Sequence, residues 1–176
     1  RGRGAYIRNC WFKDLKADTI EREAIRINML YGNTIKEVQE VNEGTPVIEN
    51  IYIENLSCNY ARRNNISIVG ISEMPVNNVS IRNVNIGGNM GVEISNAKNI
   101  NLENVSVRNE IGSAVTISDC DSIRIENLNI ISTDLDKTPI VFTNVTNSAL
   151  TGLNVLPEKL IKISGNTENL QLDDRI

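Results

Sequence analysis

The chain has 176 residues, with 18 basic and 22 acidic side chains and a net charge of -4, and this length is enough for one domain with its own core. The acidic balance argues against a nucleic-acid partner, and without an apolar run of about 18 residues we expect no membrane span. Histidine is absent, which excludes Ser-His-Asp and Cys-His catalysis and any histidine-bound metal.

The chain opens with Arg1-Gly2-Arg3-Gly4, and no apolar stretch follows that would make this a signal peptide. We therefore expect either a cytoplasmic protein or a chain that begins partway through a longer one, and we favour the second. Cys10, Cys58 and Cys120 form no C-x-x-C pair. Each lies in or beside an apolar alternation, so we expect buried thiols.

A seven-residue template repeats along the chain: Asn, apolar, any residue, apolar, any residue, Asn, apolar. It occupies residues 50–56, 78–84, 99–105 and, with Ser first, 122–128, and looser copies start at Gly4, Asn147 and Asn169. The sixth position then forms a column of Asn9, Asn55, Asn83, Asn104, Asn127, Gly152 and Asp174. Most spacings lie between 21 and 28 residues, as expected for one coil of a β-solenoid. The gap of 46 after Asn9 predicts one coil plus an insertion within residues 30–46.

The sixth position is predicted to be a bend. Ile51 and Ile53 alternate to one face, whereas Leu56 and Cys58 alternate with the opposite parity. A bend at Asn55 would bring both pairs to the interior. Such a bend needs a residue that tolerates a left-handed backbone, and the column holds only Asn, Gly and Asp. Neighbouring coils could share amide hydrogen bonds there.

A third strand of each coil precedes the template. Its copies are residues 24–28, 66–69, 91–95, 114–118, 140–142 and 160–163. The sequence therefore predicts an all-β fold, a right-handed single-stranded parallel β-helix of about seven coils and three parallel sheets. Residues 1–176 would form one segment, with an irregular insertion around 30–46. A β-sandwich would need frequent hairpins and a leucine-rich repeat would need a helix per repeat, and neither pattern is present.

Four segments carry a family resemblance. They are Arg1–Asn9, Ile25–Tyr31, Thr45–Ile53 (Thr-Pro-Val-Ile-Glu-Asn-Ile) and Gly70–Pro75 (Gly-Ile-Ser-Glu-Met-Pro). In order and spacing they resemble the C-terminal part of glycoside hydrolase family 28, the polygalacturonase-like enzymes of bacterial type. The resemblance implies hydrolysis of glycosidic bonds in pectic polysaccharides with inversion, which requires two carboxyl groups about 6.5–9.5 Å apart.

The resemblance also implies that the catalytic groups lie elsewhere. The family's motifs Asn-Thr-Asp, Asp-Asp, Gly-His-Gly and Arg-Ile-Lys normally precede the point where this chain starts, and the one Asp-Asp pair in the chain, Asp173-Asp174, lies near its other end. We therefore expect a glycosidase for the parent protein and no catalytic residue, cofactor or metal in this chain, which alone should be inactive. The pair Asp173-Asp174 suits a joint role poorly because neighbouring strand residues point to opposite faces.

The resemblance assigns substrate contacts to three residues. Tyr31 would line the sugar-binding cleft, and Arg1 and Arg3 follow the position of the family's substrate-binding Lys, where a guanidinium suits a galacturonate carboxylate. The expected partner is a pectic polysaccharide in the periplasm or outside the cell, with no nucleic acid and no membrane. We also expect end-to-end self-association of the solenoid, because its first coil has no preceding rung.

Two alternatives stay open. The chain could be a non-catalytic carbohydrate-binding or structural β-helix, as in an adhesin or spike. It could also belong to the pectate lyase type, which needs a cluster of carboxylates for calcium. Asp119 and Asp121 are near each other, but no second pair is predicted beside them.

Overall fold

The computed structural model describes residues 4–30, 37–134, 136–154 and 161–172. Within these residues the protein consists of β-strands and connecting segments, and there is no helix that could cross a membrane. The strands are β1 (Tyr6–Ile20), β2 (Ile25–Asn28), β3 (Val47–Val69), β4 (Val76–Ser132), β5 (Ile140–Thr146), β6 (Ser148–Thr151), β7 (Ile161–Ser164) and β8 (Leu170–Leu172).

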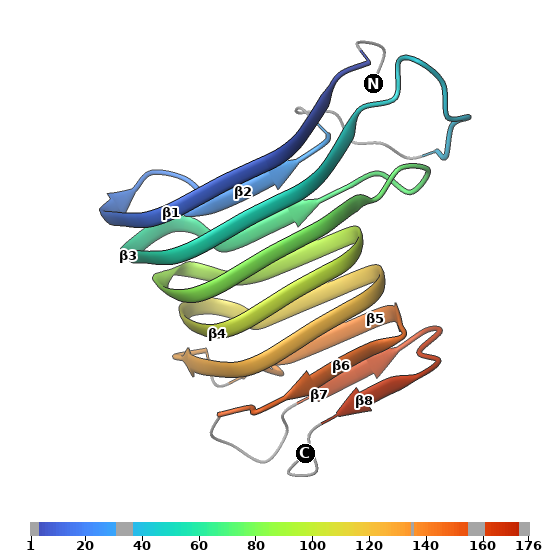
Figure 1. Cartoon of the computed structure of the whole chain (residues 1–176). Coiled ribbons are helices and arrows are strands. Elements are labelled where there is room, and N and C mark those ends of the chain that lie inside the picture. The colour runs from blue at the N-terminus through green and yellow to red at the C-terminus, as the bar shows by residue number, and fades with distance from the viewer. Residues whose placement is uncertain (1–3, 31–36, 135, 155–160, 173–176) are drawn as a thin grey trace.

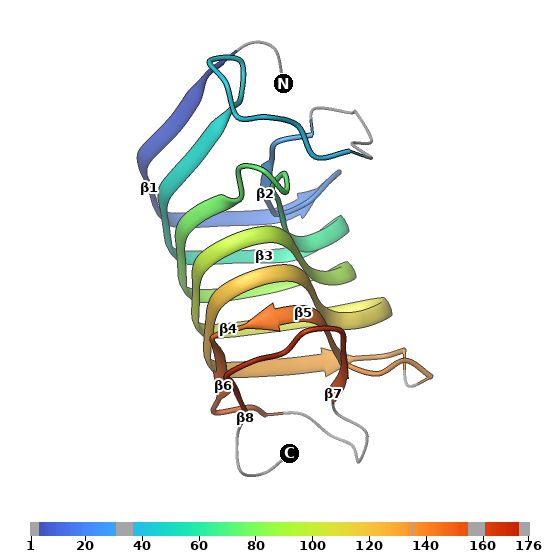
Figure 2. The ribbon, with the colours of Figure 1, turned by 90° about the vertical axis from the view of Figure 1, so that its right-hand side faces the viewer.

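Every pairing between these strands is parallel. The strand order is β1-β3-β4-β5-β7, with β2 on β3, β6 on β4 and β8 on β6. Figure 1 shows the ribbon winding around a common interior, each turn stacked on the one before, with the two termini at opposite ends of the stack. The view from the side shows the same succession of turns from β1 to β8 (Figure 2). The prediction of an all-β fold with parallel pairing is therefore confirmed.

The core is built from apolar side chains that repeat at the same position in successive turns. Ile51 pairs with Val79, and Ile66 pairs with Val92. All four are buried. The third-strand segments predicted from the sequence pair in the same way, since Ile25 faces Ile66 and Ile140 faces Ile161. Stacking of like side chains fills the interior with branched aliphatic groups at close packing.

The bend predicted at the sixth template position is confirmed wherever that position is described. Asn55, Asn83, Asn104, Asn127 and Gly152 all have a positive φ, between 53° and 66°. The bend reverses the parity of the strand, so that Ile53 and Leu56 on its two sides are both buried. Asp174 lies outside the described residues.

The sequence alignment of the first coil was wrong by five residues. Asn9 stacks on Asn50 rather than on Asn55, because Arg8 pairs with Glu49 and Cys10 with Ile51. The residue in line with Asn55 is Asp14, with φ 56°, and the two are 41 residues apart. The first complete copy of the template therefore starts at Asn9, and the insertion is shorter than the spacing of 46 implied.

Two further bend columns were not predicted. The first template position also bends, with a positive φ at Asn9, Asn50, Asn78, Asn99, Ser122, Asn147 and Asn169. A third column of Asn96, Asp119, Asn144 and Gly165 follows the third strand of the coil, again with positive φ. Apart from Ser122, both columns use the same residue types as the predicted one, because these residues reach the left-handed region at low cost.

The remaining predictions on local structure are largely met. Cys58 and Cys120 are buried, whereas Cys10 is half-buried, and all three are free thiols. Residues 37–46 contain no strand, and residues 31–36 lie outside the described part of the chain.

Candidate functional site

The three residues that the resemblance assigned to substrate, Tyr31, Arg1 and Arg3, lie outside the described residues. The structure does describe the strand that leads to Tyr31. This is β2, and at its end the side-chain Oδ1 of Asn28 accepts a hydrogen bond from the backbone N–H of Leu30 over 2.7 Å. The outer face of β2 and of the segments stacked on it is therefore the part of the molecule in which a substrate site can be sought.

Three arginines surround one carboxylate beside β2. The distances to the Glu23 carboxylate are 3.4 Å from Arg22 Nε, 3.9 Å from Arg26 Nη1 and 4.0 Å from Arg63 Nη1. The Glu23 side chain is only 9% exposed, whereas the arginines are 39–54% exposed. We call these four residues the arginine cluster, and it carries a local excess of positive charge in an acidic chain.

The local turn holds Glu23 as an anion. Burial raises its pKa, but hydrogen bonds from its own backbone N–H and from Arg22, together with the positive charges of Arg26 and Arg22, outweigh burial, so that the pKa is lowered. Glu23 thus stays ionised and orders the three guanidiniums. Each guanidinium has five N–H donors, so each retains donors for a further anion.

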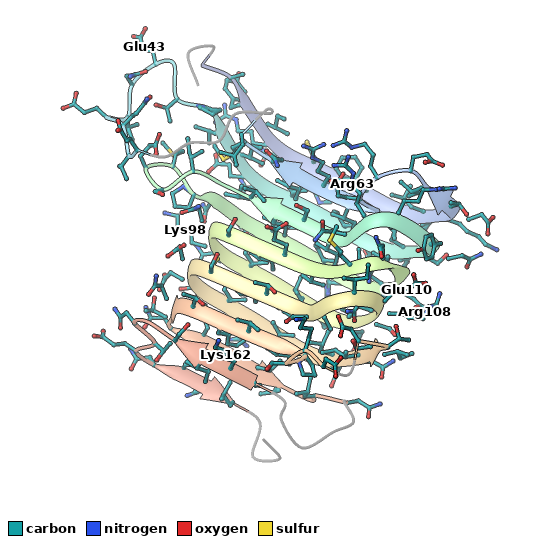
Figure 3. All side chains as sticks on the ribbon, turned by 180° about the vertical axis from the view of Figure 1, so that it is seen from behind. Glu43, Arg63, Lys98, Arg108, Glu110 and Lys162 are labelled. Carbon is teal, nitrogen blue, oxygen red and sulfur yellow. The ribbon has the colours of Figure 1, made fainter. Side chains whose placement is uncertain are left out.

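A groove of about 400 Å³ begins next to the cluster. It is lined by Asn64, Met90, Gly91, Val92, Glu93, Ile111, Gly112, Ser113 and Thr116. Register connects it to β2, since Arg26 pairs with Ser67 and Ser67 pairs with Glu93. The turn that carries Arg63 lies on the same side of the molecule as Arg108 and Glu110 (Figure 3). Asn64, which lines the groove, follows Arg63 in the sequence, so the cluster and the groove lie on neighbouring coils at one side of the molecule.

The side chains on this surface are suited to binding a ligand. A guanidinium fits a carboxylate through paired N–H donors, and the groove adds the Ser113 and Thr116 hydroxyl groups and the apolar side chains of Met90 and Ile111. Among the described residues that line the groove, Glu93 is the one carboxylate. Inverting hydrolysis needs a pair of carboxyl groups, so these lining residues do not make a catalytic centre.

Asp119 and Asp121 accept hydrogen bonds from side chains of the next coil. Asp119 Oδ1 accepts a hydrogen bond from Asn144 Nδ2 over 2.8 Å. Asp121 Oδ1 accepts from Asn147 Nδ2 over 2.7 Å and from the Thr146 hydroxyl over 2.8 Å. Among the described residues, no group of three or more Cys, Asp and Glu side chains is placed to hold a metal ion.

The arginine cluster was not identified from the sequence. Arg22, Glu23 and Arg26 are close in sequence, but Arg63 is 41 residues from Arg22, whose backbone carbonyl accepts its N–H across the insertion. That spacing equals the distance between Asn9 and Asn50. The 41-residue spacing of Arg22 and Arg63 is visible in the sequence, but it indicates a contact only when the register of the first coil is known.

Comparison of the chain with protein-family models, with curated proteins and with solved structures gave no match.

Proposed function

We propose that this chain forms distal coils of a pectin-type glycoside hydrolase, and that its arginine cluster and the adjoining groove bind the polyanionic chain of a polygalacturonate-like substrate. The observation that carries the proposal is the arginine cluster, in which three guanidiniums share one buried carboxylate. The resemblance of four sequence segments to the polygalacturonase-like family supports the same substrate class. The catalytic carboxylates would be supplied by residues upstream of Arg1, as would an export signal to the periplasm or the exterior.

The proposal includes the finer architecture. The bends at the first and sixth template positions separate the template strand from the segments before and after it, which supports three parallel sheets, and the repeat spacing supports about seven coils. A right-handed winding follows from the strong preference of parallel crossovers. In this architecture the outer face of β2 and its stacked segments is one wall of the substrate cleft, with Arg26 and Glu93 in line along it.

Binding of polygalacturonate by the purified chain tests the proposal. We expect retardation in gels that contain polygalacturonate, weakening as salt is added, because the contact is ionic. The double variant Arg26→Ala/Arg63→Ala should bind at least about tenfold more weakly, since each lost charged hydrogen bond is worth about 1.5–3 kcal/mol. Lys98→Ala, which removes an exposed cation elsewhere, is the matched control. Binding that is absent, or equal in the double variant and the control, would refute the proposal.

Hydrolysis assays separate the enzyme from the alternatives. We expect no release of reducing sugar by this chain alone, and release by a longer chain that contains the upstream coils. A longer chain that binds polygalacturonate without cleaving it would support the non-catalytic carbohydrate-binding solenoid instead. Cleavage that depends on calcium and generates an unsaturated product would indicate the pectate lyase type.

A further inference from the structure

Two aromatic rings stack on the outside of a different sheet. Trp11 in β1 and Tyr52 in β3 pair in register, and their ring centroids are 5.3 Å apart with an interplanar angle of 14°. Trp11 is 61% exposed. The chain has seven aromatic residues in all, and the core is filled almost entirely by aliphatic side chains. A stacked, solvent-facing Trp–Tyr pair is therefore an exception that the packing of this fold does not require.

The pair points outward because of strand parity. Cys10 and Phe12 flank Trp11 and align with Ile51 and Ile53, which are both buried. Trp11 must then face the solvent.

The charges around the rings neutralise each other. Lys13 Nζ lies 3.1 Å from Glu54 Oε2, and Arg82 Nε lies 2.8 Å from Glu103 Oε2. Lys13, Glu54 and Arg82 line a small pocket of about 140 Å³ together with the two rings. A volume of this size corresponds to about four or five water molecules. The pocket thus offers donors and acceptors for hydroxyl groups, and each of its two cations is already paired with a carboxylate.

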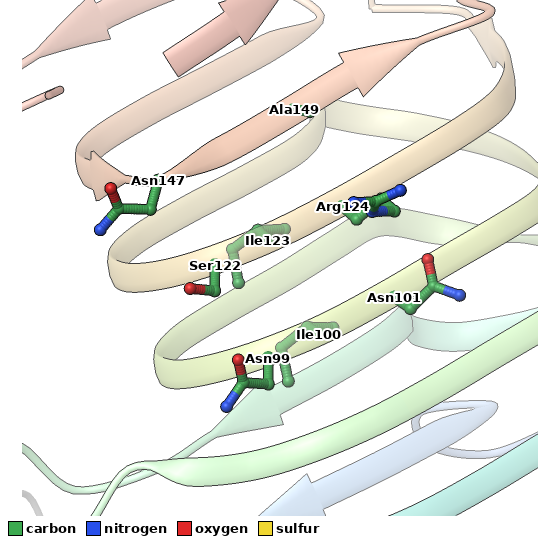
Figure 4. A pocket seen from close by; sticks show the side chains of 8 residues that line it. All are labelled: Asn99, Ile100, Asn101, Ser122, Ile123, Arg124, Asn147 and Ala149. Carbon is green, nitrogen blue, oxygen red and sulfur yellow. The ribbon is translucent and has the colours of Figure 1, made fainter. Parts of the chain in front are cut away.

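Trp11 and Tyr52 occupy the third template position, and the residues at this position in later coils line a larger groove. Tyr52 pairs with Ser80, and the next two coils place Asn101 and Arg124 in line with Ser80, as the hydrogen bonds of the neighbouring asparagine column show. Asn101 and Arg124 line a groove of about 490 Å³ (Figure 4). The Oδ1 atom of Asn101 is buried there and has no hydrogen-bond partner among the described residues. A buried acceptor without a partner indicates a missing donor, such as an ordered water.

We infer that this outer face of β1, β3 and β4 is a second saccharide-binding surface, on which Trp11 and Tyr52 stack an uncharged sugar ring and the groove around Asn101 receives the next units of the same chain. We call it the aromatic face. It uses a different sheet face and different residues from the arginine cluster, and it does not depend on the proposed function.

The aromatic rings and the charged side chains at the edge of the pocket together select a sugar. A pyranose has one face formed by C–H groups, which packs on an aromatic ring through dispersion and burial of apolar surface. Its equatorial hydroxyl groups point sideways, toward the Lys13 ammonium and the Glu54 carboxylate at the rim of the pocket. A carboxylated sugar would bring a negative charge to a neutral rim that also holds carboxylates, so the aromatic face favours uncharged units.

Intrinsic fluorescence tests this inference directly, because Trp11 is the only tryptophan of the chain. The intact chain is titrated with three neutral tetrasaccharides, β-1,4-galactotetraose, cellotetraose and mannotetraose, and with tetragalacturonate. We expect at least one neutral probe to shift the Trp11 emission in a saturable way, with a Kd at least about tenfold lower than that of tetragalacturonate. A titration in which no neutral probe changes the emission at millimolar concentration would overturn the inference, as would preferential binding of tetragalacturonate.

Three variants locate the site. Tyr52→Ala and Asn101→Ala should each raise the Kd of the neutral probe, Tyr52→Ala by about tenfold. Asn101→Ala removes a groove contact without touching the Trp11 ring, so it remains informative if Tyr52→Ala perturbs β3. Arg26→Ala/Arg63→Ala, in the arginine cluster, should leave the neutral-probe titration unchanged while weakening polygalacturonate binding. An Asn101→Ala variant with unaltered affinity would contradict the extension into the groove, and loss of neutral-probe binding in the arginine variant would contradict a separate surface.

Discussion

The side-chain amide of Asn55 donates a hydrogen bond over 2.8 Å to the carboxylate of Asp14, which lies directly above it in the preceding coil. Asn83, Asn104 and Asn127 continue this ladder, each donating its amide to the residue before it over 3.0–3.2 Å. All these bonds run in one direction, so that the N-terminal end of the ladder needs an acceptor. An ionised carboxylate is acceptor-only, and Asp119 in the third bend column likewise accepts a hydrogen bond from Asn144 in the next coil.

Substitution of Asn104 should separate the two contributions of a ladder residue, its side-chain hydrogen bonds and its tolerance of a left-handed backbone. Asn104→Ala removes two side-chain hydrogen bonds and places a Cβ-bearing residue without a local polar group at φ 54°. We expect a loss of about 2–4 kcal/mol in the free energy of unfolding, measured by urea denaturation. Asn104→Gly removes the same bonds, but glycine adopts the left-handed backbone without strain. The free energy of unfolding should therefore fall by only about 1–2 kcal/mol. Equal losses in the two variants would show that the left-handed backbone contributes nothing.

Gly152 should tolerate alanine less well than Gly112 does. Both have positive φ, 66° and 75°. A Cβ at Gly152 would lie 2.4 Å from Asn127 Oδ1, whereas a Cβ at Gly112 would meet nothing within 4 Å. Gly112→Ala therefore measures the backbone cost alone, about 1–2 kcal/mol, and Gly152→Ala should cost at least about 1 kcal/mol more because the ladder must shift. Urea midpoints of the two variants provide the comparison, and similar midpoints would contradict the close contact.

One of the three bend columns can be predicted from the sequence, and the other two cannot. The parity change between Ile53 and Leu56 identified the bend at Asn55 because both flanking pairs are apolar. The bends at Asn50 and Asn96 were missed because their residues were treated as ends of strands. Asn9 was misplaced because it has the right residue type for either template column, and only the pairing of Cys10 with Ile51 decides between them.

The candidate sites were less accessible to sequence reasoning. The resemblance pointed to Tyr31, and so to the strand β2 that leads to it, but not to Arg26 or Glu23. Trp11 and Tyr52 occupy the variable third position of the template, where no pattern predicts stacking until the register of β1 on β3 is known. Contacts across coils are set by the length of the insertion, and that length cannot be derived from the repeat itself.

Asp121 should make the stability of the protein depend on pH. Hydrogen bonds from Asn147 and Thr146 lower its pKa from the ordinary value of 3.8, against the opposing effect of burial, and Ser122 and Lys98 contribute in the same direction. Because the folded pKa is below the unfolded one, this stabilisation is complete above the unfolded value and is lost as the pH falls through the folded value.

The variant Asp121→Asn tests this dependence. At pH 7 we expect it to be about 1–2 kcal/mol less stable than the parent chain, because two charge-assisted hydrogen bonds become neutral ones. The difference should shrink as the pH is lowered below 3.8 and Asp121 itself is protonated. Urea unfolding followed by circular dichroism at several pH values gives the comparison, and a difference that is constant with pH would contradict the role of the ionised form.

The cysteines should differ in reactivity. Burial raises the pKa of the Cys120 thiol to about 12, with the nearby Asp119 adding to the effect. At pH 8 only about one molecule in ten thousand would carry the thiolate at that position. Cys10 is half-buried and lies in β1. Iodoacetamide at pH 8 should therefore modify Cys10 much faster than Cys120, as measured by peptide mass spectrometry, and faster labelling of Cys120 would show that the core opens readily.

The chain should associate end to end through the face presented by β1. Ile7, Phe12 and Leu15 point toward the interior, yet they are 54%, 48% and 43% exposed, whereas the residues on which they stack in β3 are buried. Parallel strands leave unpaired N–H and C=O groups at such an edge. The side-chain hydrogen bonds of the first template column run in the same direction, since Asn50 donates to Asn9 Oδ1 and Asn169 donates to Asn147 Oδ1. An amide N–H group thus faces outward at one end and an amide oxygen at the other.

These two ends are complementary, so a second copy can stack head to tail, and such an interface does not close on itself. We expect the weight-average mass in sedimentation experiments to rise steadily with concentration. Phe12→Lys should reduce it by burying a charge in the interface, whereas Ile131→Lys, which changes a residue that is 50% exposed on the side of the stack, should not. A monomer at every concentration, or equal association of Phe12→Lys and the parent chain, would show that the β1 face is closed by some other means.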